Sequence, residues 1–188
     1  MPTYLGAIAI VVLLGLVLSR VFMLRRQGIA AVKFGAIDKT DFLIPPVMLF
    51  YFYLVFAHTF GWPTIATAPL FPSIPLAWVG VAACATGLAL LWWSLVSFRR
   101  SFRIGIDTDK PDALITSGIF AFSRNPIYAA FALVLIGEFL IFPHWILLIY
   151  VAGFAVLVHR QVLREEDYLR VHYGSEYLDY SRRVRRYI

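Results

Sequence analysis

Residues 127–158 read IYAAFALVLIGEFLIFPHWILLIYVAGFAVLV. The stretch contains one acidic residue, Glu138, no lysine or arginine, and a proline near its middle, Pro143. At about 1.5 Å of rise per residue, its two halves, 127–142 and 145–158, cover about 21–24 Å, which is marginal for a hydrocarbon core of about 30 Å. A helical hairpin that is broken near Pro143 returns to its starting side whether or not it crosses fully. The polar motifs on the two sides of the stretch are therefore predicted to meet and build one site.

The composition places the whole chain in a membrane. Of its 188 residues, 61% are hydrophobic and 15% charged, and the mean hydropathy is +0.77, far from the values of a soluble domain. Three further apolar runs, 3–24, 42–60 and 76–98, are each near the roughly 20 residues that span a bilayer. We therefore expect an all-α integral membrane protein with about five hydrophobic helical segments in one domain, 1–188.

The distribution of lysine and arginine predicts the orientation. Apart from Arg20, these residues fall in the segments 25–39 (four), 99–124 (five) and the tail after residue 159 (seven), whereas the connectors 61–75 and 143–144 have none. The positive-inside rule then puts the N-terminus outside and the C-terminus in the cytoplasm. Nothing basic precedes the first apolar run, so we expect a retained span rather than a cleaved signal peptide.

The tail after residue 159 has the pattern of cytoplasmic amphipathic helices. Val162, Leu163, Leu169 and Tyr173 recur at helical spacing among charges of both signs, and Gly174 is suited to end that helix. A second short helix is predicted beyond it, with Arg182, Arg183, Arg185 and Arg186 facing lipid phosphate. Anionic lipid headgroups are thus the expected partner of the net charge of +6, rather than nucleic acid.

Several chemistries are disfavoured by the residues present. No GxGxxG fingerprint or phosphate loop occurs, no GxSxG elbow occurs, and the four histidines are too scattered for a metal pair, so no metal site is expected. Cys84 lies in mid-span and is expected to be a buried, inert thiol. Glu138 is expected to reach the outer interface or to pair locally, with a proton relay as the alternative.

Two polar motifs frame the hairpin, and their order is specific. The first comprises Leu114-Ile-Thr-Ser-Gly118, then Phe120, then Arg124-Asn-Pro-Ile-Tyr128; the second comprises Glu165-Glu166, Leu169, Tyr173-Gly174, Tyr177 and Tyr180. This series resembles the isoprenylcysteine carboxyl methyltransferase family, which has relatives among phospholipid methyltransferases. The resemblance covers roughly the C-terminal half of the chain.

The resemblance implies that S-adenosylmethionine is the cofactor. It would lie in a non-Rossmann pocket between the hairpin and the tail, so that 99–188 binds cofactor and substrate and 1–98 is a three-span scaffold. A lipophilic substrate would enter from the bilayer. By position, the family's cofactor contacts fall on Asp112, Ala113, Leu114, Ile115, Phe120, Asn125, Pro126, Ile127, Tyr128 and Glu165. Aromatic faces suit a sulfonium, and a carboxylate suits either the methionine ammonium or a ribose hydroxyl.

The chain departs from the family pattern at two positions. Asn125 stands where the family motif has histidine, and Gln161 stands where eukaryotic members have a substrate arginine four residues before the cofactor glutamate. Arg160 is the expected substitute for that arginine, with Gln161 able to donate a hydrogen bond to the substrate. A carboxylate acceptor needs no general base, whereas an amine or thiol would need one, for which Glu165, Glu166 or His159 are the candidates.

The leading hypothesis is methyl transfer to a lipophilic substrate, with an isoprenylcysteine-type carboxylate as the first candidate. Methylation of a phospholipid amine or a small thiol is the first alternative. An NADPH-dependent membrane reductase is a second, because the C-terminal ends of sterol reductases share some of the pattern. A non-catalytic membrane scaffold is a third, and such a scaffold should not bind S-adenosylmethionine.

Overall fold

The computed structural model describes residues 1–26, 44–65, 68–97 and 114–187. Within these ranges the chain is helical, and its only β-type pairing is an isolated bridge between Ser123 and Arg185. The elements are α1 (Pro2–Arg26), α2 (Ile44–Phe60), α3 (Ile74–Ser97), the 3₁₀ helix η2 (Gly118–Ala121), α4 (Pro126–Ile141), α5 (Trp145–Tyr173) and α6 (Ser175–Arg183). The predicted all-α class is confirmed.

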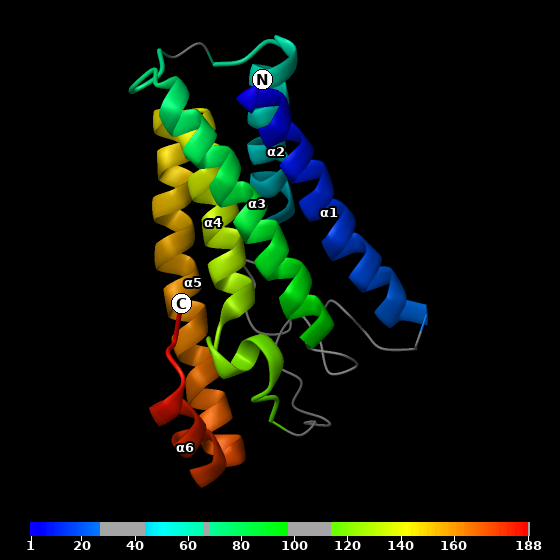
Figure 1. Cartoon of the computed structure of the whole chain (residues 1–188), viewed down its shortest axis with the longest axis vertical. Coiled ribbons are helices and arrows are strands. Elements are labelled where there is room, and N and C mark those ends of the chain that lie inside the picture. Colours follow the sequence, from blue (N-terminus) through cyan, green and yellow to red (C-terminus); the bar gives the residue numbers. More distant parts are fainter. Residues whose placement is uncertain (27–43, 66–67, 98–113, 188) are drawn as a thin grey trace.

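The helices run up and down between two ends of the molecule (Figure 1). The N-terminal end holds the start of α1 and the connectors α2–α3 and α4–α5, which touch where the Leu70 amide donates to the Pro143 carbonyl at 2.7 Å. The opposite end, called the α6 end here, holds η2 and α6. Because α4 ends at Ile141 and α5 begins at Trp145, the chain reverses at Pro143 and both arms of the hairpin return to the α6 end, as predicted.

Three helices are long and apolar enough to cross a membrane: α1, α3 and α5, with 25, 24 and 29 residues. The other two apolar helices are shorter, with 17 residues in α2 and 16 in α4. Large apolar side chains are exposed along both the long and the short apolar helices, such as Leu49 of α2 at 66% and Leu157 of α5 at 67%. Exposure of this kind is expected of residues that face lipid. Helix α5 does not stop at residue 158 but continues to Tyr173, where Gly174 ends it with a positive φ of 53°. This is the predicted amphipathic extension of the last apolar segment.

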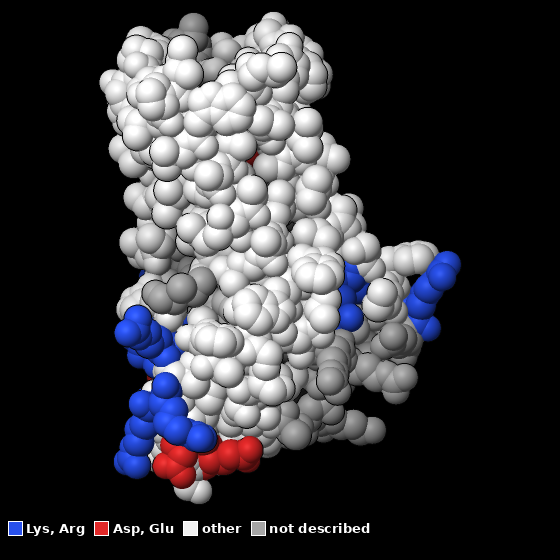
Figure 2. All heavy atoms as spheres, viewed as in Figure 1, with Lys and Arg blue, Asp and Glu red and all other residues white. Residues whose placement is uncertain are grey.

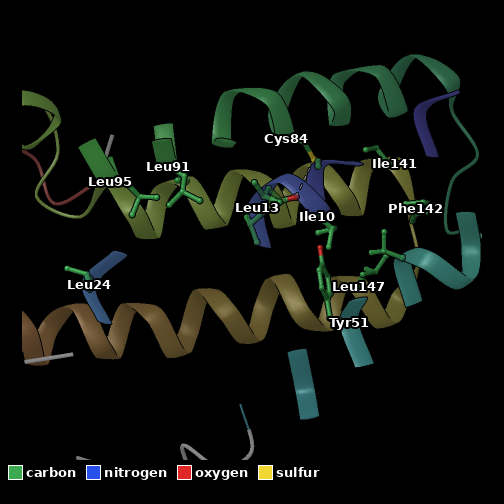
Figure 3. Close-up of a cluster of buried hydrophobic side chains, with 14 residues drawn as sticks. Ile10, Leu13, Leu24, Tyr51, Cys84, Leu91, Leu95, Ile141, Phe142 and Leu147 are labelled. Carbon is green, nitrogen blue, oxygen red and sulfur yellow. Dashed lines mark hydrogen bonds between the residues drawn. The ribbon is translucent and has the colours of Figure 1, made fainter. Parts of the chain in front are cut away.

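Small residues bring α3 and α4 into close contact. A Cβ built on Gly80 would lie 2.5 Å from the Gly137 carbonyl oxygen, and one built on Gly87 would lie 2.8 Å from that of Ala130. Helices without side chains at such positions can pack backbone to backbone, which is the usual means of association in a bilayer. The buried cluster in Figure 3 continues this contact, with Cys84 of α3 near Ile141 of α4 and Ile10 of α1, and with Leu91 and Leu95 of α3 further along the bundle.

Glu138 is fully buried between the helices. Its Oε1 atom accepts a long contact from the Cys84 thiol at 3.9 Å, and its Oε2 atom has no hydrogen-bond partner among the described residues. A notch at Gly6 makes room for the carboxyl group, since a Cβ there would lie 2.8 Å from Oε2. The expectation that Glu138 reaches the outer interface is therefore wrong, and local pairing is what occurs. Cys84 is buried and unpaired by any disulfide, as expected.

The α3–α4 contact yields a stability prediction. Gly137→Ala puts a methyl group 2.5 Å from Cys84 Sγ and 2.6 Å from the Gly80 carbonyl, and such overpacking costs about 1–3 kcal/mol. Gly153→Ala on α5 is the matched control, because nothing lies within 4 Å of a Cβ there. Thermal unfolding in detergent should show a clear loss for Gly137→Ala and little change for Gly153→Ala. Equal melting temperatures for the two variants would contradict the packing.

Candidate cofactor site at the α6 end

Gly118 fixes the first motif to the end of α3. Its φ is +65°, and a Cβ there would lie 2.6 Å from Ser97 Oγ, so a side chain is excluded on both counts. Ser97 Oγ accepts a hydrogen bond from the Ile119 amide at 3.3 Å. The turn η2 is thereby seated on α3, and it leads directly into the start of α4.

Helix α4 starts at Pro126, the first-turn position where a missing amide proton costs least. The preceding Asn125 does not cap the helix with its side chain. Instead, its Nδ2 atom donates to the Arg186 carbonyl at 3.1 Å, while its own amide donates to Ser123 Oγ at 3.2 Å. Asn125 therefore links the start of α4 to the tail.

Glu165 and Glu166 are adjacent on α5 and serve different clusters, because successive residues project about 100° apart on a helix. Glu165 Oε1 accepts two hydrogen bonds, from Tyr128 Oη at 2.7 Å and from Gln161 Nε2 at 2.9 Å. Its Oε2 atom accepts none from the described residues. Glu165 thus joins α4 to α5 and keeps one carboxylate oxygen for a further donor.

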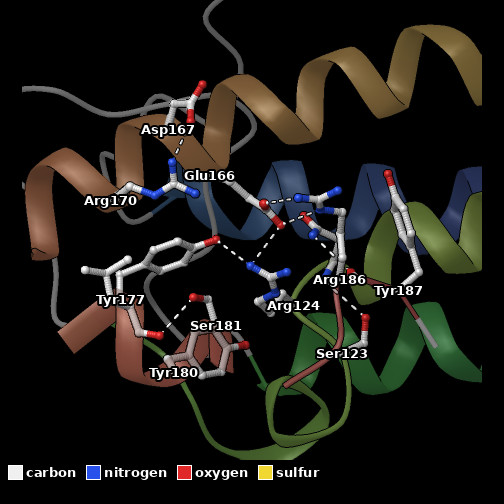
Figure 4. Close-up of polar contacts among 12 residues, drawn as sticks. Ser123, Arg124, Glu166, Asp167, Arg170, Tyr177, Tyr180, Ser181, Arg186 and Tyr187 are labelled. Carbon is white, nitrogen blue, oxygen red and sulfur yellow. Dashed lines mark hydrogen bonds and ion pairs between the residues drawn. The ribbon is translucent and has the colours of Figure 1, made fainter. Parts of the chain in front are cut away.

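Glu166 is the centre of the second cluster (Figure 4). It is 4% exposed and lies 3.1 Å from Arg124 Nη1, which also donates to Tyr177 Oη at 3.2 Å. The Arg186 guanidinium binds the same carboxylate through two atoms, Nε at 3.0 Å and Nη2 at 2.9 Å. One buried carboxylate therefore holds two arginines, one from the turn before α4 and one from the segment after α6.

The tail packs back on the first motif. Tyr177 and Tyr180 of α6 are buried, and Tyr180 Oη donates to the Phe120 carbonyl at 2.8 Å. Burial raises the pKa of the Tyr180 phenol, and the bond to Glu166 raises the pKa of the Arg186 guanidinium, so both remain hydrogen-bond donors at neutral pH. Beyond α6 the Arg124 amide donates to the Arg185 carbonyl at 2.9 Å, and Tyr187 Oη lies 3.0 Å from His159 Nδ1.

The predicted site residues are thus distributed unevenly. Tyr128, Gln161 and Glu165 are in direct contact. Arg160 is exposed, as is the neighbouring Arg164. The other predicted residues are described in part: Asn125 faces the tail, Phe120 and Pro126 are buried, Ile127 packs on the core, Leu114 and Ile115 are half-buried, and Asp112 and Ala113 lie outside the described residues.

Sequence reasoning missed the Glu166 cluster and the contact between Tyr187 and His159. The expectation that Arg186 faces lipid phosphate is wrong, because its guanidinium turns inward to Glu166. The available signal was the pair Glu165-Glu166, since two adjacent carboxylates at a membrane surface call for separate partners. Within the described ranges, no group of three or more histidine, cysteine or acidic side chains is arranged to hold a metal ion.

Comparison with known proteins gives this geometry a family. The chain is 28% identical over 130 residues to a protein of Arabidopsis thaliana, protein-S-isoprenylcysteine O-methyltransferase B, in an alignment that covers 64% of each chain. No solved structure matches the chain at a significant level. The profile of the family described as phospholipid methyltransferase matches residues 76–176, more than half of the 188. That range contains α3 except for its first two residues, all of α4 and α5, and the cluster of Tyr128, Gln161 and Glu165. The chain belongs to the phospholipid methyltransferase family.

Proposed function

We propose that the protein is a membrane methyltransferase that uses S-adenosylmethionine and acts on a lipophilic substrate. The observation that carries the proposal is the half-buried Glu165, which Tyr128 and Gln161 hold between α4 and α5 and whose Oε2 atom accepts no hydrogen bond from the described residues. Family membership supports an enzyme of the methyltransferase class. The matched region is the part of the chain that supplies these three side chains.

The donor set fits the proposed cofactor. Glu165 Oε2 is suited to accept from the methionine ammonium or from a ribose hydroxyl, and Tyr128 adds an aromatic face next to it. Leu114 and Ile115, both half-buried at the α6 end, offer apolar surface for an adenine ring. When bound there, S-adenosylmethionine supplies an electrophilic methyl group on a sulfonium. The role of Tyr128 and Gln161 is to fix the Glu165 side chain in one orientation, so that little of its conformational freedom is lost when the cofactor binds.

An isoprenylcysteine-type carboxylate is the first candidate for the acceptor. The name of the Arabidopsis relative supports it, and a carboxylate is already ionised at neutral pH, so positioning is the main requirement. Arg160 is exposed on α5 one residue before Gln161, where an arginine can meet a substrate carboxylate at the membrane surface. Gln161 has a second amide proton beyond the one given to Glu165. We infer that these two residues orient the substrate.

A phospholipid amine is the second candidate, and the family description supports it. This reaction would need a base for the amine proton. Glu166 is poorly suited to that task, because both of its oxygens are bonded to arginine. His159 is better placed, since it lies on the same helix with Tyr187 as a partner.

The charges of the described residues support an orientation with the α6 end in the cytoplasm. In Figure 2 the blue and red side chains gather in the lower part of the molecule, where α6 lies, and the upper part is almost white. Arg182, Arg183 and Arg185 are exposed there, so we propose anionic headgroups of the cytoplasmic leaflet as their partners. In this proposal the chain is one domain, in which residues 1–98 support the binding half.

The cofactor proposal predicts a binding loss at Glu165. Glu165→Gln keeps the shape of the side chain and removes its charge, and a hydrogen bond to a charged group is worth about 1.5–3 kcal/mol, or roughly a 10–100-fold change in Kd. Calorimetric titration of the detergent-purified protein with S-adenosylhomocysteine measures it. Asp167→Asn is the control, because Asp167 is exposed and pairs with Arg170 on the surface. Unchanged affinity in Glu165→Gln, with the fold intact, would count against this site.

The acceptor proposal predicts the chemistry of the product. With methyl-labelled S-adenosylmethionine and membranes, label transferred to a carboxylate forms an ester that base releases as methanol, whereas label on an amine stays with the lipid. Arg160→Ala should lower turnover about tenfold or more through lost positioning while cofactor affinity stays as it was. Arg164→Ala is the matched control. Base-stable label in the wild-type protein would reject the carboxylate and leave the amine or the thiol.

The orientation is measurable because Cys84 is the single cysteine and is buried. In a Cys84→Ala background, Ser175→Cys at the α6 end and Ser73→Cys at the N-terminal end report on opposite sides. A membrane-impermeant maleimide should label Cys at position 73 in intact cells and at position 175 only in inverted vesicles. The reverse pattern would overturn the proposed orientation.

A further inference from the structure

We propose that residues 184–187, called the tail strap here, form one wall of the cofactor site, and that Arg186 is the residue that positions this wall. The inference rests on the proposed function, because it concerns the same site. It goes beyond the motif residues, since the strap follows α6 and lies outside residues 76–176 that match the family.

The strap is attached first to the start of α4. Its backbone accepts two hydrogen bonds there, from the Arg124 amide to the Arg185 carbonyl at 2.9 Å and from Asn125 Nδ2 to the Arg186 carbonyl at 3.1 Å. Val184 is extended, with φ −115° and ψ 134°, so α6 ends and the chain runs alongside the polar turn. The amide of Asn125, a predicted cofactor residue, is therefore oriented by the strap.

The strap is attached next to α5. Arg186 makes its two-atom contact with Glu166, and Tyr187 Oη meets His159 Nδ1 at 3.0 Å. Glu166 and His159 are seven residues apart, which puts them on one face of α5, two turns from each other. The strap thus bridges α4 and α5 along one side of the seam between them, as Figure 4 shows for Arg186 and Tyr187.

The cofactor candidates line the neighbouring side of the same seam. Gln161 and Glu165 project from α5 at angles well away from Glu166, and Tyr128 reaches Glu165 from α4. In the proposed arrangement the strap closes the side of the seam that carries Asn125 and Glu166, so that a ligand of Glu165 would meet a wall there instead of an open groove.

The charge arrangement favours a permanent wall over a movable cover. Glu166 is 4% exposed, and release of Arg186 would leave this buried carboxylate with Arg124 alone. Loss of one partner from a buried ionic cluster is costly, because the remaining charge stays desolvated. Arg186 is therefore expected to stay bonded through the binding cycle.

The test compares Arg186→Gln with Arg182→Gln in the detergent-purified full chain. Both changes remove one tail arginine, but Arg182 is exposed and pairs only with Asp179 on the surface. The measurements are the Kd for S-adenosylhomocysteine, taken well below the melting temperatures, and the melting temperature itself. Arg186→Gln should weaken binding about tenfold or more, because the tail strap is no longer held against α5. Arg182→Gln should leave binding unchanged. A merely structural role would lower the melting temperature and leave the Kd of the folded protein unchanged.

Each of the other results rejects either the wall alone or the wall together with the proposed function. Wild-type binding together with an equal Kd in Arg186→Gln rejects the wall and leaves the proposed function standing. Tighter binding in Arg186→Gln rejects the wall in favour of an obstructing tail. Absence of binding in the wild type rejects the proposed function and the wall with it. If Arg186→Gln does not fold, Tyr187→Ala decides in its place, because it leaves Glu166 paired with both arginines.

Discussion

A single buried carboxylate, that of Glu166, holds together the parts of the chain that form the α6 end. Arg124 reaches it from the turn before α4, and Arg186 reaches it from the segment after α6. Because the two contacts converge on one residue of α5, the first motif, the extended part of α5 and the tail are fixed relative to one another. The contact between Tyr128 and Glu165 depends on this arrangement. It joins the first turn of α4, which follows Arg124, to the residue of α5 that precedes Glu166.

The close contact of α3 with α4 provides the other constraint. Gly80, Gly87 and Gly137 let the backbones meet, and Gly118 then seats η2 on the end of α3. The start of α4 is thus held from two directions, by α3 along the bundle and by Glu166 at its end. The polar contacts at the α6 end supply the precision that a binding site needs.

Much of this arrangement was predictable, because it leaves a periodic or compositional signal. The apolar runs gave the helices to within a few residues, Pro143 gave the hairpin, and Gly174 gave the end of α5. The meeting of Tyr128 with Glu165 also followed from the hairpin, since both residues flank it. These features depend on hydrophobic length and backbone geometry, which the order of residues determines directly.

The remainder was not predictable for physical reasons. The second short helix was expected to carry Arg182, Arg183, Arg185 and Arg186 toward the headgroups, but α6 ends at Arg183 and Val184 is extended. Backbone carbonyls that accept from Arg124 and Asn125 leave no pattern in the sequence, so the pair Glu165-Glu166 indicated that a second partner was needed but not that Arg186 is that partner. Glu138 looked like an interface residue because it lies near a helix end, whereas the notch at Gly6 that admits its carboxyl group comes from another helix.

The dependence on Glu166 is tested most directly by amide hydrogen exchange in Glu166→Gln. The Arg124 amide is protected by the Arg185 carbonyl, and the Val184 amide by the Tyr180 carbonyl, so both report on the α6 end. If Glu166 holds this end together, exchange should accelerate together at the start of α4 and in the tail, while the α3–α4 contact remains protected. Faster exchange confined to the turn of α5 around residue 166 would contradict the account.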